Sequence, residues 1–435
     1  MPRKQNKSFR GGHLGWANAC VGDNGAPGIM DYADGFSESA KLLIEQVLAT
    51  RAVTYPVDKF IYPICFSIRH AVELKLKKAV DDLTALSKYQ RPIPEFDKVG
   101  THSLLLVWRY IHEHARRVDA RFITLIDEMD EYIRDIAEAD ETGQTFRYPN
   151  ELLTDKKHLV EFAIINVVVL YKRFGELEEL LQKFYSLSTV LIDEYEQGSY
   201  TSKLSRHQLF KVGIDLTDRD KWGTDEFKAN KQFLQEKYGL SSRDHCKALV
   251  IIQNHYEMSG LINQQKQIDT ISFEKLLVFF DGWAELHDIE KIKFPGDPTI
   301  INLDSEDLLD EWMSSMKSDK AAYDKVAAAL EASEMATIQT LFYFARSMRY
   351  SEQFQSLFEI YSEEVGDTGT EAFRQSVMHI LDKTNALENI LNSLNMLNQD
   401  EMVNRILDRY TLQAYRDRLM ADSNAIKARR DSLLK

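Results

Sequence analysis

The chain has 435 residues, a length that predicts two or three domains rather than one compact core. Hydrophobic residues make up 44% and charged residues 28%, a balance typical of a soluble globular protein. Nine prolines and nineteen glycines are few for this length and favour helices over many-turned β-structure. The net charge of −14 argues against whole-molecule attraction to nucleic acid, although it leaves room for a local basic groove.

The cysteines and the apolar segments indicate a cytoplasmic protein. Cys20, Cys65 and Cys246 are far apart and follow no disulfide or metal spacing, which suits a reducing compartment. No segment reaches the roughly 18 apolar residues of a membrane-spanning helix. The longest apolar run, 162–171, is about half that length and is predicted to be a buried helix. The N-terminus is basic, but no apolar signal region follows it.

The first part of the chain is predicted to be an irregular arm followed by a helical bundle. Residues 1–28 are rich in Gly, Asn and Lys, a composition that predicts the irregular arm. Helical periodicity then predicts a bundle over 29–197. Its helices are expected at 31–48, 57–86, 119–139 and 155–196, and Gly175 is a candidate break in the last of these. One more helix is expected to begin after Thr101 or Ser103, either of which can serve as its N-cap.

The rest of the chain is predicted to be helical as well, so the expected fold class is all-α. Residues 198–298 form a linker and a helical middle region, with helices at 225–238, 241–262 and 272–289. The segment 211–223 has no clean period and is either a short strand or a loop. A break at 294–298 precedes a C-terminal bundle or solenoid over 299–435, with about seven helices of roughly 10–18 residues. Acidic residues interleave with the basic ones of the last twenty residues, which favours a solvated helix over a nucleic-acid tail.

Several classes of enzyme chemistry are disfavoured by missing motifs. The sequence contains no Gly-rich phosphate loop, no His-Glu-x-x-His, no Cys-x-x-Cys and no Gly-x-Ser-x-Gly. ATPases, zinc enzymes and serine hydrolases are therefore disfavoured. We predict no cofactor and no metal site.

The predicted helix 57–86 carries an unusual group of charges in an apolar context. Arg69, Glu73 and Lys77 follow at i, i+4 and i+8 and so form one line, with His70 beside Arg69. One interpretation is a ladder of ion pairs on a solvated face. The other is that these groups have partners or a task, because an apolar helix does not normally accept an arginine and a histidine side by side.

Four motifs in order resemble a branch of the HEPN superfamily, over about residues 30–190. They are Asp31-Tyr-Ala-Asp-Gly35-Phe36; Tyr62-Pro63 with Arg69-His70-Ala-Val-Glu73-Leu74-Lys-Leu-Lys77; Gly100-Thr-His102-Ser-Leu104 with Trp108; and Phe146-Arg147-Tyr148-Pro149. HEPN domains are helical bundles found widely in prokaryotic toxin and antiphage systems. The resemblance implies a bundle that often dimerises and that, in active members, is a metal-independent endoribonuclease.

The chain departs from the HEPN pattern at one place. Active members carry an Arg, then four to six residues, then a His, whereas the positions that follow Arg69 at this spacing are Leu74, Lys75 and Leu76. Arg109 with His114 and Arg374 with His379 fit the spacing, but chance gives about as many matches. Any activity must therefore draw a histidine from elsewhere.

The resemblance and the chemistry of RNA cleavage define a predicted site. Its catalytic residues are Arg69, His70, Glu73 and His102, and its binding residues are Arg147, Tyr148 and Lys77. His70 or His102 would do acid/base work, Arg69 and Arg147 would bind phosphate, and Glu73 would orient one of these side chains. The alternative is that Arg69, Glu73 and Arg147 form a buried network that ties the Phe146–Pro149 loop to the bundle.

Three functions follow from this sequence. The first is a HEPN-type endoribonuclease effector of an antiviral defence system, which is expected to bind RNA and to form a homodimer through its N-terminal bundle. The second is a non-catalytic subunit of a defence complex that binds nucleic acid, a nucleotide or a protein partner. The third is a structural scaffold. No membrane association is expected.

Overall fold

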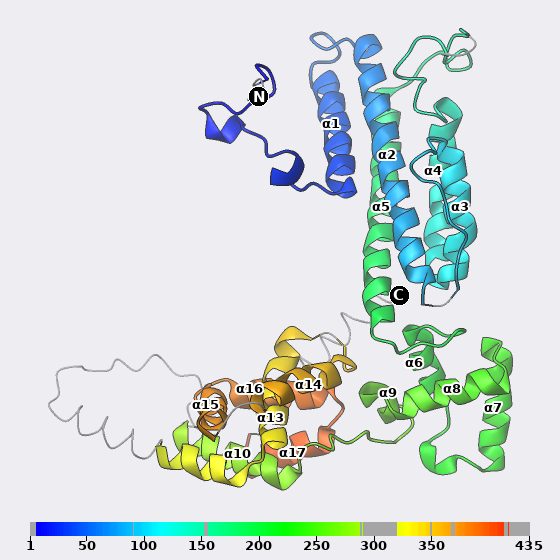
Figure 1. The fold of residues 1–435 in the computed structure, drawn as a ribbon. Coiled ribbons are helices and arrows are strands. Elements are labelled where there is room, and N and C mark those ends of the chain that lie inside the picture. Colours follow the sequence, from blue (N-terminus) through cyan, green and yellow to red (C-terminus); the bar gives the residue numbers. More distant parts are fainter. Residues whose placement is uncertain are drawn as a thin grey trace, which may run out of the picture. The chain divides into compact units, whose positions relative to one another are not determined.

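A computed structural model describes residues 6–89, 91–151, 155–287, 289, 320–348, 350–366, 370–412 and 416 (Figure 1). Every regular element within these residues is a helix, which confirms the all-α fold class, and one isolated bridge joins Asn150 to Lys157. The chain divides into two compact units, Met1–Tyr195 and Glu196–Lys435. None of the helices in the described segments is long and apolar enough to cross a membrane.

The first unit begins with an exposed arm and continues as a bundle of long helices. All described residues of the arm, 6–28, are exposed, and the arm holds only the short 3-10 turns Gly15–Ala17 and Gly22–Asn24. The bundle consists of α1 (Ile29–Ala49), α2 (Val57–Ser87), α3 (Leu104–Val118), α4 (Ile123–Ala139) and α5 (Val167–Glu196). Ser103 is the N-cap of α3, where its hydroxyl accepts a hydrogen bond from the Leu106 amide.

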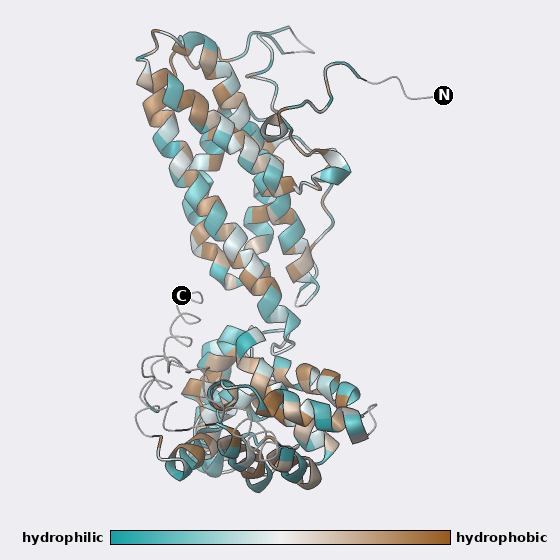
Figure 2. Ribbon diagram, turned by 90° about the vertical axis from the view of Figure 1, so that its left-hand side faces the viewer, coloured by the Kyte–Doolittle hydropathy of each residue, from teal (hydrophilic) through white to brown (hydrophobic). Residues whose placement is uncertain are grey.

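Amphipathic sequences hold the bundle together. Hydrophobic and hydrophilic residues alternate along each helix (Figure 2), as expected where one stripe of a helix faces a shared core. The Trp108 side chain is fully buried, and its indole N–H donates to the Asp130 carboxylate over 2.7 Å. Phe122 stacks on Phe184 at 4.6 Å between ring centroids, which attaches α5 to the short turn before α4.

The fifth helix of the bundle differs from its prediction at both the start and the middle. It begins at Val167 rather than at 155, because the Asn166 side chain accepts from the Val168 and Val169 amides and starts the helix there. Residues 155–166 are irregular, and Leu159 has a positive φ of 56°. The helix continues through Gly175 without a break. The predicted buried helix at 162–171 is therefore wrong in its first half, and Ile164 is 89% exposed.

The second unit is built from shorter helices. They are α6 (Arg206–Asp215), α7 (Asp225–Tyr238), α8 (Ser242–Gln253), α9 (Tyr256–Gly260), α10 (Phe273–Leu286), α13 (Ala332–Ser347), α14 (Gln353–Gly366), α15 (Thr370–Leu381), α16 (Ala386–Met396) and α17 (Asp400–Arg409). Residues 320–329 are helical too. The predicted break at 294–298 and almost all of the predicted terminal helix lie outside the described residues.

Two predictions for the second unit are wrong. The segment 211–223 is neither strand nor simple loop, because α6 covers its first residues and starts from a capping box between Ser205 and Gln208. The helix predicted over 241–262 is two helices. His255 separates them, since its Nδ1 accepts from the amides of Glu257 and Met258 and so starts α9.

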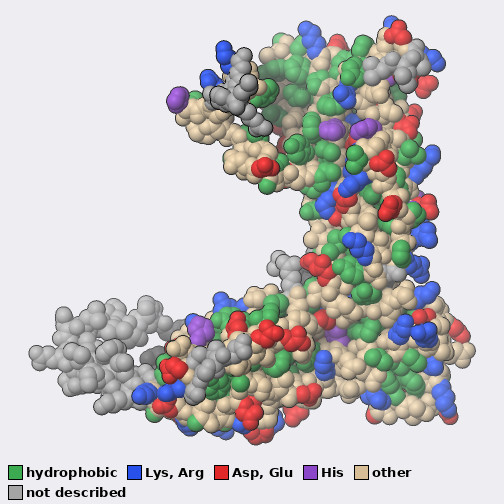
Figure 3. Space-filling view, in the orientation of Figure 1, with side chains coloured by type: hydrophobic (Ala, Val, Ile, Leu, Met, Phe, Trp, Pro, Cys, Tyr) green, Lys and Arg blue, Asp and Glu red, His purple; other side chains and the backbone are tan. Residues whose placement is uncertain are grey.

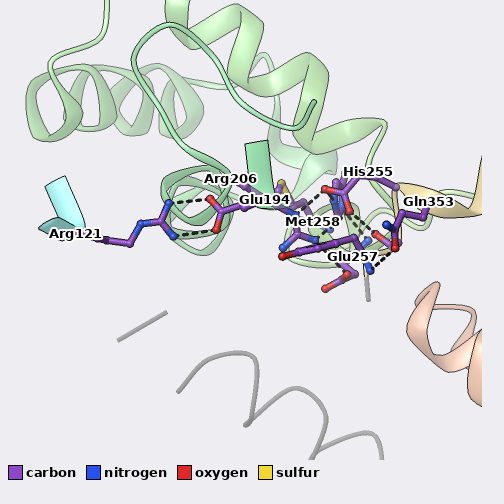
Figure 4. Close-up of polar contacts among 10 residues, drawn as sticks. Arg121, Glu194, Arg206, His255, Glu257, Met258 and Gln353 are labelled. Carbon is purple, nitrogen blue, oxygen red and sulfur yellow. Dashed lines mark hydrogen bonds and ion pairs between the residues drawn. The ribbon is translucent and has the colours of Figure 1, made fainter. Parts of the chain in front are cut away.

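Buried ion pairs fix helices within each unit (Figure 4). In the first unit, Arg121 donates to both carboxylate oxygens of Glu194 over 2.9 Å. In the second unit, Arg206 donates to both carboxylate oxygens of Glu352, and His255 Nε2 lies 2.8 Å from the same group. Burial alone would raise the pKa of Glu352, but His255 and Arg206 outweigh it and hold that pKa far below its usual range. Each of these pairs joins residues that are far apart in the sequence, and so holds segments of the same unit together.

Candidate functional site

Arg69, Glu73 and Lys77 lie on one line of α2, as predicted, but the line faces the interior. Arg69 Nη1 donates to Glu73 Oε2 over 2.7 Å, and Lys77 Nζ lies 2.8 Å from Glu73 Oε1. Arg69 is 1% exposed, Glu73 5% and Lys77 9%. The interpretation as a ladder on a solvated face is therefore wrong. A charge buried to this extent remains only when it is paired and hydrogen-bonded.

The remaining donors of Arg69 hold two other parts of the bundle. Its Nε donates to the carbonyl of Asp140 over 2.8 Å, and its Nη2 donates to the carbonyls of His102 and Glu141 over 2.6 and 2.7 Å. Asp140 ends α4, and His102 precedes the N-cap of α3. One guanidinium thus joins α2 to the end of α4 and to the start of α3.

The His102 side chain contacts this network through Glu73 and is otherwise exposed to solvent. Its Nδ1 lies 3.0 Å from Glu73 Oε1, while its side chain is 65% exposed. Burial alone would raise the pKa of Glu73, but hydrogen bonds from Lys77, His102 and Arg69 lower it to about 2. An ionised carboxylate only accepts hydrogen bonds, so His102 carries a proton on Nδ1 and turns Nε2 away from Glu73.

His70 occupies the exposed edge of the same helix. Its ring is stacked on Phe66 at 5.8 Å between centroids and meets the edge of Phe36 from α1 at 4.5 Å. The side chain is half-buried, and this burial lowers the pKa of His70, while the nearby Glu73 carboxylate acts in the opposite direction. At neutral pH the imidazole is therefore mainly in its neutral form.

Arg147 and Tyr148 complete the surface from the turn after α4. Both are exposed, and the Arg147 guanidinium carbon lies 5.7 Å from the Phe66 ring centroid and 5.4 Å from that of Tyr148. Within the described part of the chain, Arg147 forms no ion pair. Arg147 is thus not part of the buried network that the alternative interpretation assigned to it. The Arg147 guanidinium is exposed to solvent and lies near the rings of Phe66 and Tyr148.

All seven predicted residues lie in one region of the first unit, but they form two groups. Arg69, Glu73 and Lys77 make a buried group whose polar atoms contact one another and the main chain. His70, His102, Arg147 and Tyr148 make a solvent-accessible group, which we call the exposed group. Figure 3 shows histidine side chains bordered by hydrophobic ones over this unit. The side chains of the exposed group are accessible to solvent, whereas the polar atoms of the buried group are already occupied by one another and by the main chain.

The prediction of the site omitted a row of aromatic side chains on α2 and the main-chain carbonyls to which Arg69 donates. Tyr62, Phe66 and His70 follow at i, i+4 and i+8 on the outer side of α2, and Tyr62 is 48% exposed. This spacing is readable in the sequence. The carbonyls of Asp140 and Glu141 carry no signal of their own, because every residue has a carbonyl group.

The described residues contain no cluster of potential metal ligands, and the comparisons with known proteins found no match. No group of three or more His, Cys, Asp or Glu side chains among them could hold a metal ion. No family model, no curated protein and no solved structure matches the sequence or the fold. The HEPN resemblance therefore rests on the four sequence motifs alone.

The buried group makes Arg69 a determinant of stability. We expect Arg69→Ala to lower the free energy of unfolding by about 3–5 kcal/mol, because it leaves three buried carbonyls without their donor and removes one of the partners of the buried Glu73. Arg147→Ala is the matched control and should change the free energy by less than about 1 kcal/mol, because this side chain is exposed. Urea unfolding of the full chain measures both. Equal effects of the two substitutions would contradict the division into two groups.

Glu73 should make the stability of the first unit fall in acid. Its pKa is about 2 in the folded chain, and it rises to about 4.3 on unfolding. The carboxylate therefore contributes its full stabilisation above about pH 4.5, and this contribution is lost as the pH falls towards 2. Unfolding free energies measured across this range should fall less steeply for Glu73→Gln than for the wild type. Parallel curves for the two proteins would show that Glu73 is not held ionised by its partners.

Proposed function

We propose that the first unit is a metal-independent endoribonuclease of the HEPN type, acting through the exposed group. The observation that carries this proposal is the pairing of His102 with the buried, ionised Glu73, whose charge also acts on a second histidine, His70. A carboxylate that holds Nδ1 of an imidazole fixes its tautomer and orients Nε2 for proton transfer. Two histidines and an arginine supply the base, the acid and the cation that cleavage through a 2′-hydroxyl needs.

The two histidines have different tasks in this proposal. His70, whose pKa is lowered by burial, accepts the proton of the 2′-hydroxyl, and the resulting oxygen attacks the adjacent phosphorus. His102 donates a proton from Nε2 to the departing 5′-oxygen, and Glu73 holds Nδ1 of the same ring so that Nε2 is directed away from the carboxylate. The products are a 2′,3′-cyclic phosphate and a free 5′-hydroxyl, and the phosphate charge is balanced by Arg147 in the transition state.

The same surface favours single-stranded RNA as substrate. Exposed aromatic rings and an arginine on one surface are the usual means of binding unpaired bases by stacking. The exposed Tyr62 and Tyr148 and the half-buried Phe66 provide the rings, and Arg147 lies against Phe66 and Tyr148. Because the chain carries a net charge of −14, binding depends on these local contacts rather than on the charge of the molecule as a whole.

Arg69 has a different role from the one the sequence suggested. All its described hydrogen bonds go to Glu73 and to main-chain carbonyls, so it is a positioning residue rather than a phosphate ligand. This engagement also favours a second function, in which the exposed group binds RNA without cleaving it. The non-catalytic alternative differs from the first in one measurable respect, the presence of turnover.

Cleavage of a fluorescently labelled single-stranded RNA in the presence of EDTA tests the proposal. We expect His70→Ala and His102→Ala each to lower the cleavage rate by about 10²–10⁴-fold, because each removes one proton-transfer group. His112→Ala is the matched control, since this half-buried histidine on α3 contacts Arg116 and Asp127 instead. It should leave the rate unchanged.

Binding of a non-cleavable 2′-deoxy analogue separates the two functions. Arg147→Ala should weaken this binding by about tenfold, because it removes a cation and a stacking partner. A wild-type protein that binds the analogue but never cleaves RNA would replace the ribonuclease by the binding function. A protein that neither binds nor cleaves would contradict both.

A further inference from the structure

A cavity of about 540 Å³ lies among α2, α4, α5 and the segment before α5 in the first unit. Its walls are largely apolar, and they include Ile68, Ile136, Phe146, Phe162, Leu170 and Phe174. Protein interiors are close-packed and leave few voids larger than a water molecule. A cavity of this size is instead within the range of about 300–1,000 Å³ that holds small molecules.

The charged side chains that line the cavity are mostly paired already. Arg69 is held by Glu73 and by main-chain carbonyls. Arg173 donates to Glu131 and to Asp135 over 2.8 Å, and its guanidinium lies 3.9 Å from the Tyr132 ring centroid. Neither cation is left to neutralise an anionic ligand. An uncharged ligand needs no cation to neutralise it, and it loses little hydration energy when it enters the cavity.

Apolar side chains at the cavity remain open to water. Ile164 is 89% exposed and Val169 is 60% exposed, although both line the cavity. Ile164 belongs to the apolar run 162–171, which the sequence predicts to be buried. Removing such apolar side chains from water is favourable. This apolar surface is therefore available to a ligand rather than used by the core.

We propose that this cavity is a binding site for an uncharged, largely apolar small molecule. The inference goes beyond the ribonuclease proposal and does not depend on it. The size of the cavity sets the size of the ligand, the apolar walls set its hydrophobic character, and the paired arginines set its lack of charge. The exposed group plays no part in this binding.

Two fluorescent probes with the same rings test both the site and the class of ligand. N-phenyl-1-naphthylamine is uncharged, and 8-anilinonaphthalene-1-sulfonate is the same ring system with a sulfonate. Titration of the full chain should show saturable binding of the uncharged probe with one molecule per chain. The sulfonate should bind at least about tenfold more weakly, because the cavity offers it no free cation.

Neighbouring residues of α5 give a matched pair of variants. Val169→Trp places a large side chain in the cavity and should weaken binding of the uncharged probe at least about tenfold. Val168→Trp is the control, because Val168 is 57% exposed but does not line the cavity. It should bind the probe as the wild type does. Both positions are exposed, so circular dichroism should show both variants to be folded.

Three results would overturn the inference. The first is the absence of saturable binding by the wild-type chain, and the second is equal affinity for the two probes. The third is a dimer of the wild-type chain in sedimentation velocity that Val169→Trp converts to a monomer. In that case a second copy of the chain, rather than a small molecule, covers this surface.

Discussion

The guanidinium of Arg69 is the interaction on which the geometry of the first unit's site depends. It is almost completely buried and donates hydrogen bonds to one carboxylate and three carbonyls. Two of these carbonyls belong to the end of α4 and its following turn, and the third belongs to His102. Because a guanidinium is planar and its donors point in fixed directions, it sets the relative positions of the segments that it joins. The location of His102 follows from this arrangement.

The structure separates the residues that position the site from those that can react. Arg69, Glu73 and Lys77 are saturated by one another and by the main chain, so they offer no free group to a substrate. His102 and Arg147 are exposed, and His70 is half-buried, so all three are accessible from solvent. Glu73 links the two groups, since it is ionised by its buried partners and holds the exposed His102 ring. Buried ion pairs of this kind are costly to break, which makes them suitable supports for a surface site.

Much of this arrangement could be predicted from the sequence, because it depends on helical periodicity. The spacing of Arg69, Glu73 and Lys77 gives their common line on α2, and the cap at Ser103 gives the start of α3. Whether these charged side chains face the interior or the solvent could not be predicted. It is decided by the carbonyls of Asp140 and Glu141, which come from a distant turn and have no side-chain signature. The alternative interpretation places Arg147 in the buried network, whereas the structure places its side chain outside that network and exposed to solvent.

The remaining errors concern the residues at which two helices begin. The apolar run 162–171 was expected to be buried, but composition alone does not say whether the fold provides a partner surface. There the helix starts only at Val167, where Asn166 satisfies the first amides, and Ile164 stays open to water. In the second unit, His255 ends one helix and starts the next through its imidazole. Histidine is not among the usual capping residues, so this break could not be predicted from the residue types alone.

The central claim is that the exposed group, and not the buried one, meets the substrate. Histidine ring signals in NMR spectra of the full chain, recorded with and without a 2′-deoxy oligonucleotide, test this most directly. We expect the signals of His70 and His102, assigned from the single alanine variants, to shift on binding. The signal of the buried His114 on α3 should stay in place. Saturable binding that leaves both His70 and His102 unshifted would contradict the account.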